Sequence, residues 1–109
     1  MELTGKTFRA ISNSRNGALN SETRMAFVSE DAAGIVGVYG GGTIAHGSVV
    51  ATRTGEHSLF MLYHCATVGG ELRVGRAAAT FTDGRHMHLD WEWMTGDRSA
   101  GTSEWILEP

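Results

Sequence analysis

Residues 89–105, LDWEWMTGDRSAGTSEW, alternate apolar with polar side chains, break at Thr95-Gly96-Asp97, and then alternate again. This pattern predicts a strand, a tight turn and a returning strand. All three tryptophans of the chain lie here, and Trp91 and Trp93 share one face of the first strand because side chains alternate across a strand. Two indoles on one face suit either a dense core or the wall of a binding pocket, since each brings a broad rigid surface and one N–H that needs a partner.

The rest of the chain repeats this rhythm of short strands and turn-forming residues. The expected strands cover residues 6–12, 18–29, 35–39, 43–53, 58–67 and 72–82, and the tryptophan-bearing pair supplies the last two. Turn formers at 13–17 and the Asp83-Gly84 dipeptide predict hairpin connections. Strands joined by such short turns, with no helix between them, predict an antiparallel meander.

The fold class that follows is all-β, an eight-stranded antiparallel meander barrel with little or no helix. Closure is favoured because a closed barrel leaves no exposed edge, and an open sandwich is the alternative because strand number alone does not distinguish the two. The length of 109 residues, with fifteen glycines against one proline, predicts a single domain over residues 1–109. An eight-stranded barrel encloses a lumen that side chains fill or that one small ligand occupies.

Composition excludes several classes of partner. The net charge of −3 and the scattered nine Lys and Arg residues leave no basic stripe, so nucleic acid is not an expected partner. No stretch has the character of a signal peptide or the length of a membrane span, so no membrane partner is expected. The single cysteine, Cys65, has no internal partner for a disulfide, which favours a cytoplasmic location.

Motifs for metal, cofactor or nucleophilic chemistry are weak. His86 and His88 share a strand face with two carboxylates and offer metal-ligand chemistry, but a polar row opposite an apolar one is also typical of a solvent-facing strand surface. The solvent-facing interpretation is favoured, and no metal is expected. Cys65 lies in mid-strand and indicates a buried thiol, while residues 40–42 lack the Lys-Ser/Thr of a phosphate loop, so no cofactor is expected.

Charged and apolar residues in unexpected places suggest two further features. Glu22, Arg76 and Glu104 interrupt strands that are otherwise apolar or small, and a charge facing the lumen would need a partner there. Outward placement of these charges is the favoured alternative. Phe60 and Leu62 lie on the face opposite the other apolar residues of their strand, which indicates a subunit interface and a homodimer.

Several short segments, in a characteristic order and spacing, resemble a family of short bacterial proteins often labelled n-acetylglutamate synthase. The resembling segments are Arg9-Ala10-Ile11-Ser12-Asn13-Ser14 to Gly17, Ser21-Glu22-Thr23, Tyr39 with Gly41, Gly47, Tyr63-His64, Gly70-Glu71-Leu72 with Gly75, and Trp91-Glu92-Trp93 through Thr95-Gly96-Asp97, Ser99 and Gly101. They span nearly the whole chain, and the resemblance implies a small barrel of meandering strands. The strand number and the Trp-rich closing strands are also similar in architecture to avidin and lipocalin barrels.

Three functional hypotheses follow. The first is a small-molecule binding barrel whose lumen is lined by the large inward side chains Tyr39, Met61, Tyr63, Trp91, Trp93 and Trp105. The second is an enzyme in which an inward Glu22 or Glu104 acts as general acid or base on a ligand held by these aromatic residues. The third is a structural or assembly module without a pocket.

Overall fold

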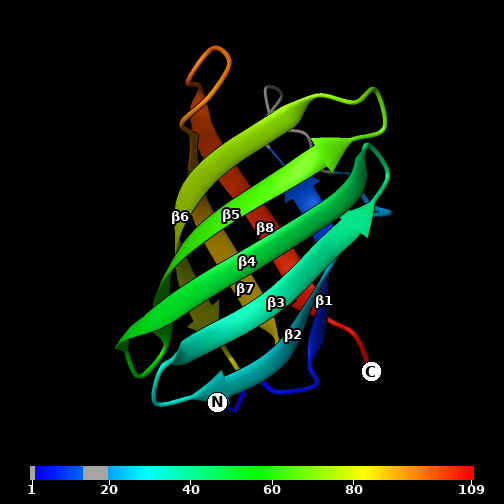
Figure 1. The fold of residues 1–109 in the computed structure, drawn as a ribbon. Coiled ribbons are helices and arrows are strands. Elements are labelled where there is room, and N and C mark those ends of the chain that lie inside the picture. Colours follow the sequence, from blue (N-terminus) through cyan, green and yellow to red (C-terminus); the bar gives the residue numbers. More distant parts are fainter. Residues whose placement is uncertain (1, 14–19) are drawn as a thin grey trace.

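The computed structural model describes residues 2–13 and 20–109 and folds them into one closed barrel of eight antiparallel strands (Figure 1). The strands are β1 (Thr7–Asn13), β2 (Arg24–Asp31), β3 (Gly34–Gly41), β4 (Ile44–Gly55), β5 (Ser58–Thr67), β6 (Leu72–Thr82), β7 (His86–Trp93) and β8 (Ala100–Leu107). Each strand pairs with the next, and β8 pairs with β1. The predicted all-β meander barrel is confirmed, and the open sandwich is excluded. No helix forms in the described ranges, and hence none of the length and apolarity that crossing a membrane requires.

The strand boundaries follow the turn chemistry of the sequence. β5 and β6 match the expected ranges. The turn between β6 and β7 contains Asp83 at φ 49° and Gly84 at φ 70°, and positive φ at both central residues matches the right-handed twist of the flanking strands. The hairpin turn predicted at residues 13–17 lies almost wholly outside the described residues.

The strand predicted from residue 18 begins only at Arg24. Asn20 forms a turn instead: its side-chain Oδ1 accepts the N–H of Glu22 at 2.8 Å, and its carbonyl accepts the N–H of Thr23 at 2.9 Å. Asn is a frequent turn former because its side chain competes with backbone partners in this way. Glu22 therefore lies in an exposed turn before β2 rather than on a strand.

The interior is filled by the alternate side chains of all eight strands. In β5, for example, Leu59, Met61, Tyr63 and Cys65 are buried and the residues between them are exposed or partly exposed. The buried apolar residues form one continuous cluster from end to end of the barrel. Period-two alternation thus places one apolar set inside a cylinder that has an outer face on every strand.

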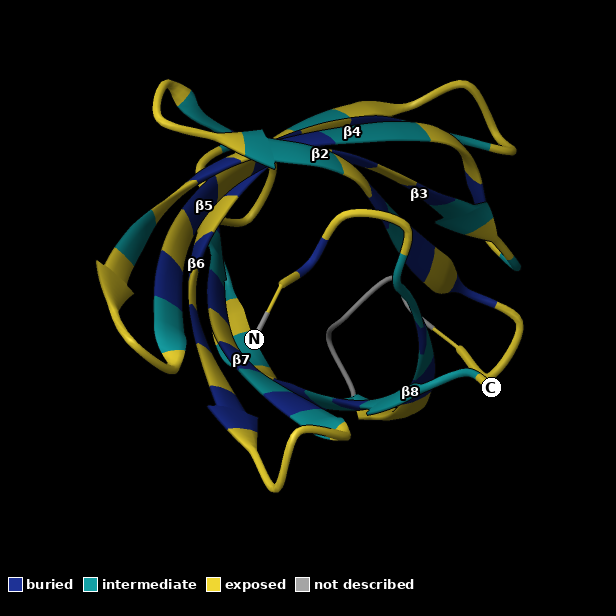
Figure 2. Cartoon of the chain, turned by 90° about the horizontal axis from the view of Figure 1, so that it is seen from below, coloured by how far each residue is buried: buried dark blue, intermediate teal, exposed yellow. Residues whose placement is uncertain are grey.

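The lower end of the barrel in Figure 1 is closed by the N-terminal segment. Viewed from below, this segment passes across the mouth of the barrel (Figure 2). Leu3 is fully buried, the N–H of Gly5 donates to the carbonyl of Phe27 at 2.8 Å, and the N–H of Phe27 donates to the carbonyl of Lys6 at 2.9 Å. Phe8 lies behind it, with its ring centroid 5.9 Å from that of Phe27 and 5.7 Å from that of Phe81.

Candidate ligand site at the upper end of the barrel

Four aromatic side chains, the upper aromatic cluster, meet inside the opposite end of the barrel: Tyr39, Tyr63, Trp91 and Trp93. Trp93 is the last residue of β7 and Tyr39 lies two residues before the end of β3, and both strands run toward this end. The ring centroids are 6.1 Å apart for Tyr39 and Tyr63, 5.4 Å for Tyr63 and Trp93, and 6.2 Å for the two tryptophans. The edge-to-face and tilted angles are those that aromatic quadrupoles favour.

Glycines on the neighbouring strands leave room for the two tyrosine rings. Tyr39 pairs with Gly47 across β3 and β4, and Tyr63 pairs with Gly75 across β5 and β6. A Cβ atom at Gly47 would lie 2.6 Å from the Tyr39 ring, and one at Gly75 would lie 2.5 Å from the Tyr63 ring. Each ring therefore lies flat over the backbone of the next strand, a close approach that only glycine permits.

Three hydrogen-bond donors of this cluster are buried without a partner among the described residues: Tyr39 Oη, Trp91 Nε1 and Trp93 Nε1. The fourth polar group, the Tyr63 hydroxyl, donates to the Glu92 carbonyl only at a long 3.5 Å. A buried polar group without a partner costs free energy, and such groups in native proteins are normally satisfied by protein, water or ligand. The cluster therefore presents several unused donors in one place.

The electrostatics of the upper end keep both tyrosines neutral. Burial raises the pKa of Tyr39, with a further contribution from the neighbouring Cys65 thiol, and burial likewise raises the pKa of Tyr63. The guanidinium carbon of Arg73, on β6, lies 5.2 Å from the Trp93 ring centroid, and its Nε donates to Glu71 at 2.8 Å. A cation over the indole face is a cation–π contact, so the rim of the site carries the Arg73–Glu71 ion pair next to the ring donors.

Six of the eight candidate ligand-binding residues are buried inside the barrel: Tyr39, Met61, Tyr63, Trp91, Trp93 and Trp105. They do not form one site. Trp105 Nε1 donates to the buried Ser103 hydroxyl at 2.9 Å, so its only polar group is already paired. Met61 lies on β5 opposite Ala51 and Ala77 and has no polar group to offer. These two residues belong to the packed core.

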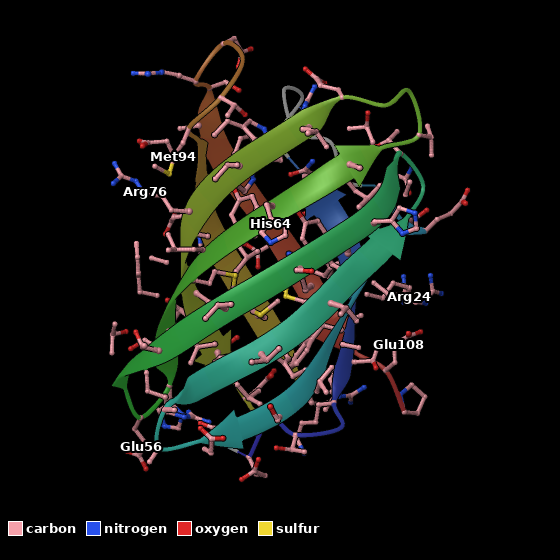
Figure 3. The ribbon with its side chains drawn as sticks, in the orientation of Figure 1. Arg24, Glu56, His64, Arg76, Met94 and Glu108 are labelled. Carbon is pink, nitrogen blue, oxygen red and sulfur yellow. The ribbon has the colours of Figure 1, made fainter. Side chains whose placement is uncertain are left out.

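The two carboxylates lie outside the lumen. Glu22 occupies the exposed turn described above. Glu104 lies between the buried Ser103 and Trp105 and therefore points to the outer wall, where it contacts His88 Nδ1. The enzyme hypothesis required one of these groups beside an interior ligand, and the structure removes that geometry. Arg76 is also outward and pairs with Glu92 at 2.8 Å (Figure 3).

The outer face of β7 and β8 carries the ionic row that the sequence offered as a metal alternative. His88 contacts Glu104 through Nδ1 and Asp90 through Nε2 at 3.3 Å, and His86 contacts Asp83 at 3.0 Å. The hydrogen bond to Glu104, and then that to Asp90, raises the pKa of His88. Over residues 2–13 and 20–109, no group of three or more His, Cys, Asp or Glu side chains is arranged to hold a metal ion.

From the sequence, Gly47 and Gly75 were named only within the resembling segments, and neither these glycines nor Arg73 were assigned to the site. The glycines were visible as interruptions of expected strands, but their role depends on which aromatic residue each one faces across the sheet. That information is the strand register, which a one-residue slip would change completely.

The model of the avidin-like protein family matches residues 1–106 of the chain. No curated protein and no solved structure matches it. The family match supports the similarity to avidin barrels and gives no support to the n-acetylglutamate synthase label. With a closed eight-stranded meander barrel and a match over nearly its whole length, this chain belongs to the family of avidin-like proteins.

Proposed function

We propose that this protein binds a small molecule at the upper end of its barrel, against the upper aromatic cluster. The observation that carries the proposal is the group of three buried donors, Tyr39 Oη, Trp91 Nε1 and Trp93 Nε1, that have no partner in the described part of the chain. Membership of the avidin-like family supports it, because barrels of eight strands have room for one small ligand.

The chemistry of the site indicates what kind of molecule it accepts. The ring faces offer stacking surface for a flat or apolar body, and the orphaned N–H and O–H groups need acceptor atoms. The Arg73 guanidinium at the rim, which also pairs with Glu71, has further N–H donors that could meet an acceptor of the ligand. The expected ligand is therefore a compact molecule with carbonyl, carboxylate or heteroaromatic acceptors, and the protein serves as a binder of it.

The test is a fluorescence and calorimetric titration of the protein against a panel of carboxylates, amides and heteroaromatic compounds. Because all three tryptophans are inside the barrel, a bound acceptor next to Trp91 and Trp93 is expected to change their emission. Panel members that carry the same ring but lack the acceptor are expected to bind weakly, since they leave the buried donors unpaired.

A matched pair of glycine substitutions locates the binding. Gly47→Ala places a methyl group 2.6 Å from the Tyr39 ring and is expected to abolish binding by displacing it. Gly40→Ala on β3 is the control, because its Cβ would make only ordinary contacts, with the Ile44 carbonyl at 3.7 Å and the Ala45 carbonyl at 3.9 Å. If no acceptor in the panel binds, or if both variants bind equally well, the upper aromatic cluster is not a ligand site.

A further inference from the structure

The chain has a single cysteine, Cys65, whose side chain points into the upper end of the barrel. The strand register forms an inward row of four residues across β3 to β6: Tyr39, Gly47, Cys65 and Arg73. Because β3 and β5 run toward the upper mouth, this row lies nearer the mouth than the row that contains Tyr63. Side chains directly opposite on neighbouring strands have Cβ atoms about 5 Å apart, so the thiol is part of the wall of the candidate ligand site.

The ring of Tyr39 extends from β3 toward this thiol. A Cβ atom at Gly47 would lie 2.6 to 2.8 Å from three atoms of the ring, so the ring lies over Gly47 and toward the next residue of the row, Cys65. The pKa of Tyr39 reflects the same neighbourhood, because burial raises it first and the Cys65 thiol raises it further. Tyr39 is only 6% exposed, and its hydroxyl has no hydrogen-bond partner in the described residues. A sulfur atom and an unused donor therefore lie side by side.

Solvent touches this part of the interior, unlike the core below it. Cys65 is 4% exposed and Tyr63 is 8% exposed, whereas Met61 is fully buried and Trp105 is 1% exposed. Along β5, Cys65 lies two inward positions nearer the upper mouth than Met61. A small molecule that enters at this mouth therefore meets the thiol before it meets the packed core. A cysteine sealed inside a core is chemically inert, and the position of Cys65 at the mouth distinguishes it from that case.

We propose that Cys65 captures a compact α,β-unsaturated carbonyl compound at the upper end of the barrel, with Tyr39 donating to the carbonyl oxygen. The proposal rests on the function proposed above and narrows its ligand class, because a flat conjugated molecule stacks on the ring faces and offers the acceptor that the Tyr39 hydroxyl needs. In the addition, the Cys65 sulfur forms a bond to the β-carbon, the C=C π bond breaks, and the thiol proton ends on the α-carbon. No group leaves, and no external oxidant or reductant takes part. The hydrogen bond from Tyr39 stabilises the negative charge that develops on the carbonyl oxygen.

Other thiol chemistries fit this position less well. An internal disulfide needs a second cysteine, which the chain lacks. Acyl transfer needs a general base beside the thiol, but His64 lies on the opposite, outer face of β5 (Figure 3). The residues directly opposite Cys65 are a glycine and an arginine, and neither is a base. Addition to a conjugated carbonyl compound needs only the thiol and a donor for the carbonyl oxygen, and both are in place.

The test is intact-mass spectrometry of the native full chain after incubation with cyclohexenone. Because the chain has one cysteine, the expected product carries one cyclohexenone, at Cys65. Binding beside the thiol and the hydrogen bond from Tyr39 are expected to make this addition at least about 10-fold faster than the addition to glutathione under the same conditions. Cys65→Ser is expected to give no adduct. An addition no faster than that to glutathione, or the same adduct on the Cys65→Ser variant, overturns the proposal.

A second variant separates the donor role of Tyr39 from its packing. Tyr39→Phe keeps the ring over Gly47 and removes the hydroxyl, so the addition of cyclohexenone is expected to slow by about 10-fold or more. Alkylation of Cys65 by iodoacetamide displaces iodide and needs no donor at a carbonyl oxygen, so its rate should be the same in the variant and the wild type. An unchanged rate of cyclohexenone addition, or an equal slowing of both reactions, overturns the role of Tyr39.

Calorimetry with cyclohexanone separates this proposal from the function on which it rests. The saturated ketone has the same acceptor and a similar size but no C=C bond, so it is expected to bind reversibly and to leave the mass of the protein unchanged. Binding of cyclohexanone without addition of cyclohexenone overturns the capture by Cys65 alone. The absence of both binding and addition overturns the function proposed above as well.

Discussion

The two ends of the barrel interior are built from different aromatic chemistry. At the lower end Phe8, Phe27 and Phe81 meet in edge-to-face and tilted contacts behind the segment that carries the buried Leu3, and none of these side chains has a polar atom. At the upper end the four rings of the upper aromatic cluster carry buried O–H and N–H groups, three of which have no partner in the described residues. The lower end gains stability from burial alone, whereas the upper end keeps donors whose desolvation is not offset by a hydrogen bond from any residue that the structure describes.

This difference indicates that the two ends of one continuous core have different roles: the phenylalanine end stabilises the fold, and the tyrosine and tryptophan end holds polar groups. The phenylalanine end is sealed by the N-terminal segment, with Glu30 accepting the N–H of Leu3 at 3.3 Å while also pairing with Arg53. The hydrogen bonds from Arg53 and Leu3 lower the pKa of Glu30 despite its partial burial, so this latch is anionic at neutral pH. No equivalent plug fills the tyrosine and tryptophan end in the described ranges; Arg73 and glycine backbone border it. Four predictions test this comparison.

The largest effect is expected at the lower end. Phe8→Ala removes a fully buried ring that contacts two others, and the lost burial together with the cavity is expected to cost about 3–5 kcal/mol of unfolding free energy. Chemical denaturation measures it. Trp93→Phe is the comparison at the upper end and should cost clearly less, because it keeps a ring and removes an N–H that has no partner among residues 2–13 and 20–109. Equal losses of unfolding free energy in the two variants would contradict the different roles of the two ends.

The next effect appears at alkaline pH and reports on the upper end alone, since Tyr39 and Tyr63 are the only tyrosines. Burial raises both folded-state pKa values above the ordinary value of about 10. A raised pKa contributes stability that is present below the unfolded pKa and is lost as the pH rises through the folded value. Unfolding free energy should therefore fall by about 1.4 kcal/mol per pH unit per tyrosine above about pH 10.

Tyrosinate absorption and denaturation at about pH 9 and about pH 11 measure this loss. The absorption should not appear until the protein unfolds. The double variant Tyr39→Phe with Tyr63→Phe is the control and should remove this part of the loss. A tyrosinate signal near pH 10 from the folded protein would mean that the rings are open to solvent.

A smaller loss of stability is expected when the hydrogen-bond partner of the Trp105 indole is removed. Ser103→Ala leaves Trp105 Nε1 buried without its acceptor, which should cost about 1–3 kcal/mol. The substitution converts Trp105 into the state in which Trp91 and Trp93 already exist, so it measures what an unpartnered donor costs in this barrel. Ser103→Thr retains a hydroxyl and serves as the control in denaturant titrations. If Ser103→Ala loses no stability, buried indole donors do not need a partner in this barrel, and the unpartnered Trp91 and Trp93 donors do not indicate a ligand.

The barrel itself was predictable because period-two alternation and turn residues are local signals. The ranges 58–67 and 72–82 coincide with β5 and β6 because Gly55 and the Asp83-Gly84 turn mark their ends clearly. The start of β2 was wrong because Asn20 uses its side chain and carbonyl to form a turn within a stretch that also alternates. Local alternation alone does not reveal which partner a backbone group finds.

The site was only partly predictable, for a different reason. Six inward residues were identified because a strand has only two faces, but whether a donor is satisfied depends on its neighbour across the sheet. Trp105 and Trp93 look alike in sequence, and only the position of Ser103 separates a packed ring from an orphaned one. The ligand and the cytoplasmic location stay predictions, since neither follows from the arrangement of the strands.

The smallest effect on stability is expected from Tyr39→Phe, and it is the sharpest test of the upper end. The variant keeps the ring over Gly47 and removes only a hydroxyl that has no hydrogen-bond partner in the described residues, so stability should be unchanged or rise by up to about 1 kcal/mol. Tyr63→Phe is the control, because it removes the long contact to Glu92 and should cost slightly more. Binding of an acceptor-bearing ligand should weaken in the Tyr39 variant while its denaturation midpoint does not fall. A stability loss above about 1 kcal/mol would mean that the hydroxyl already has a partner in the free protein, such as an ordered water, and that its donor is not held for a ligand.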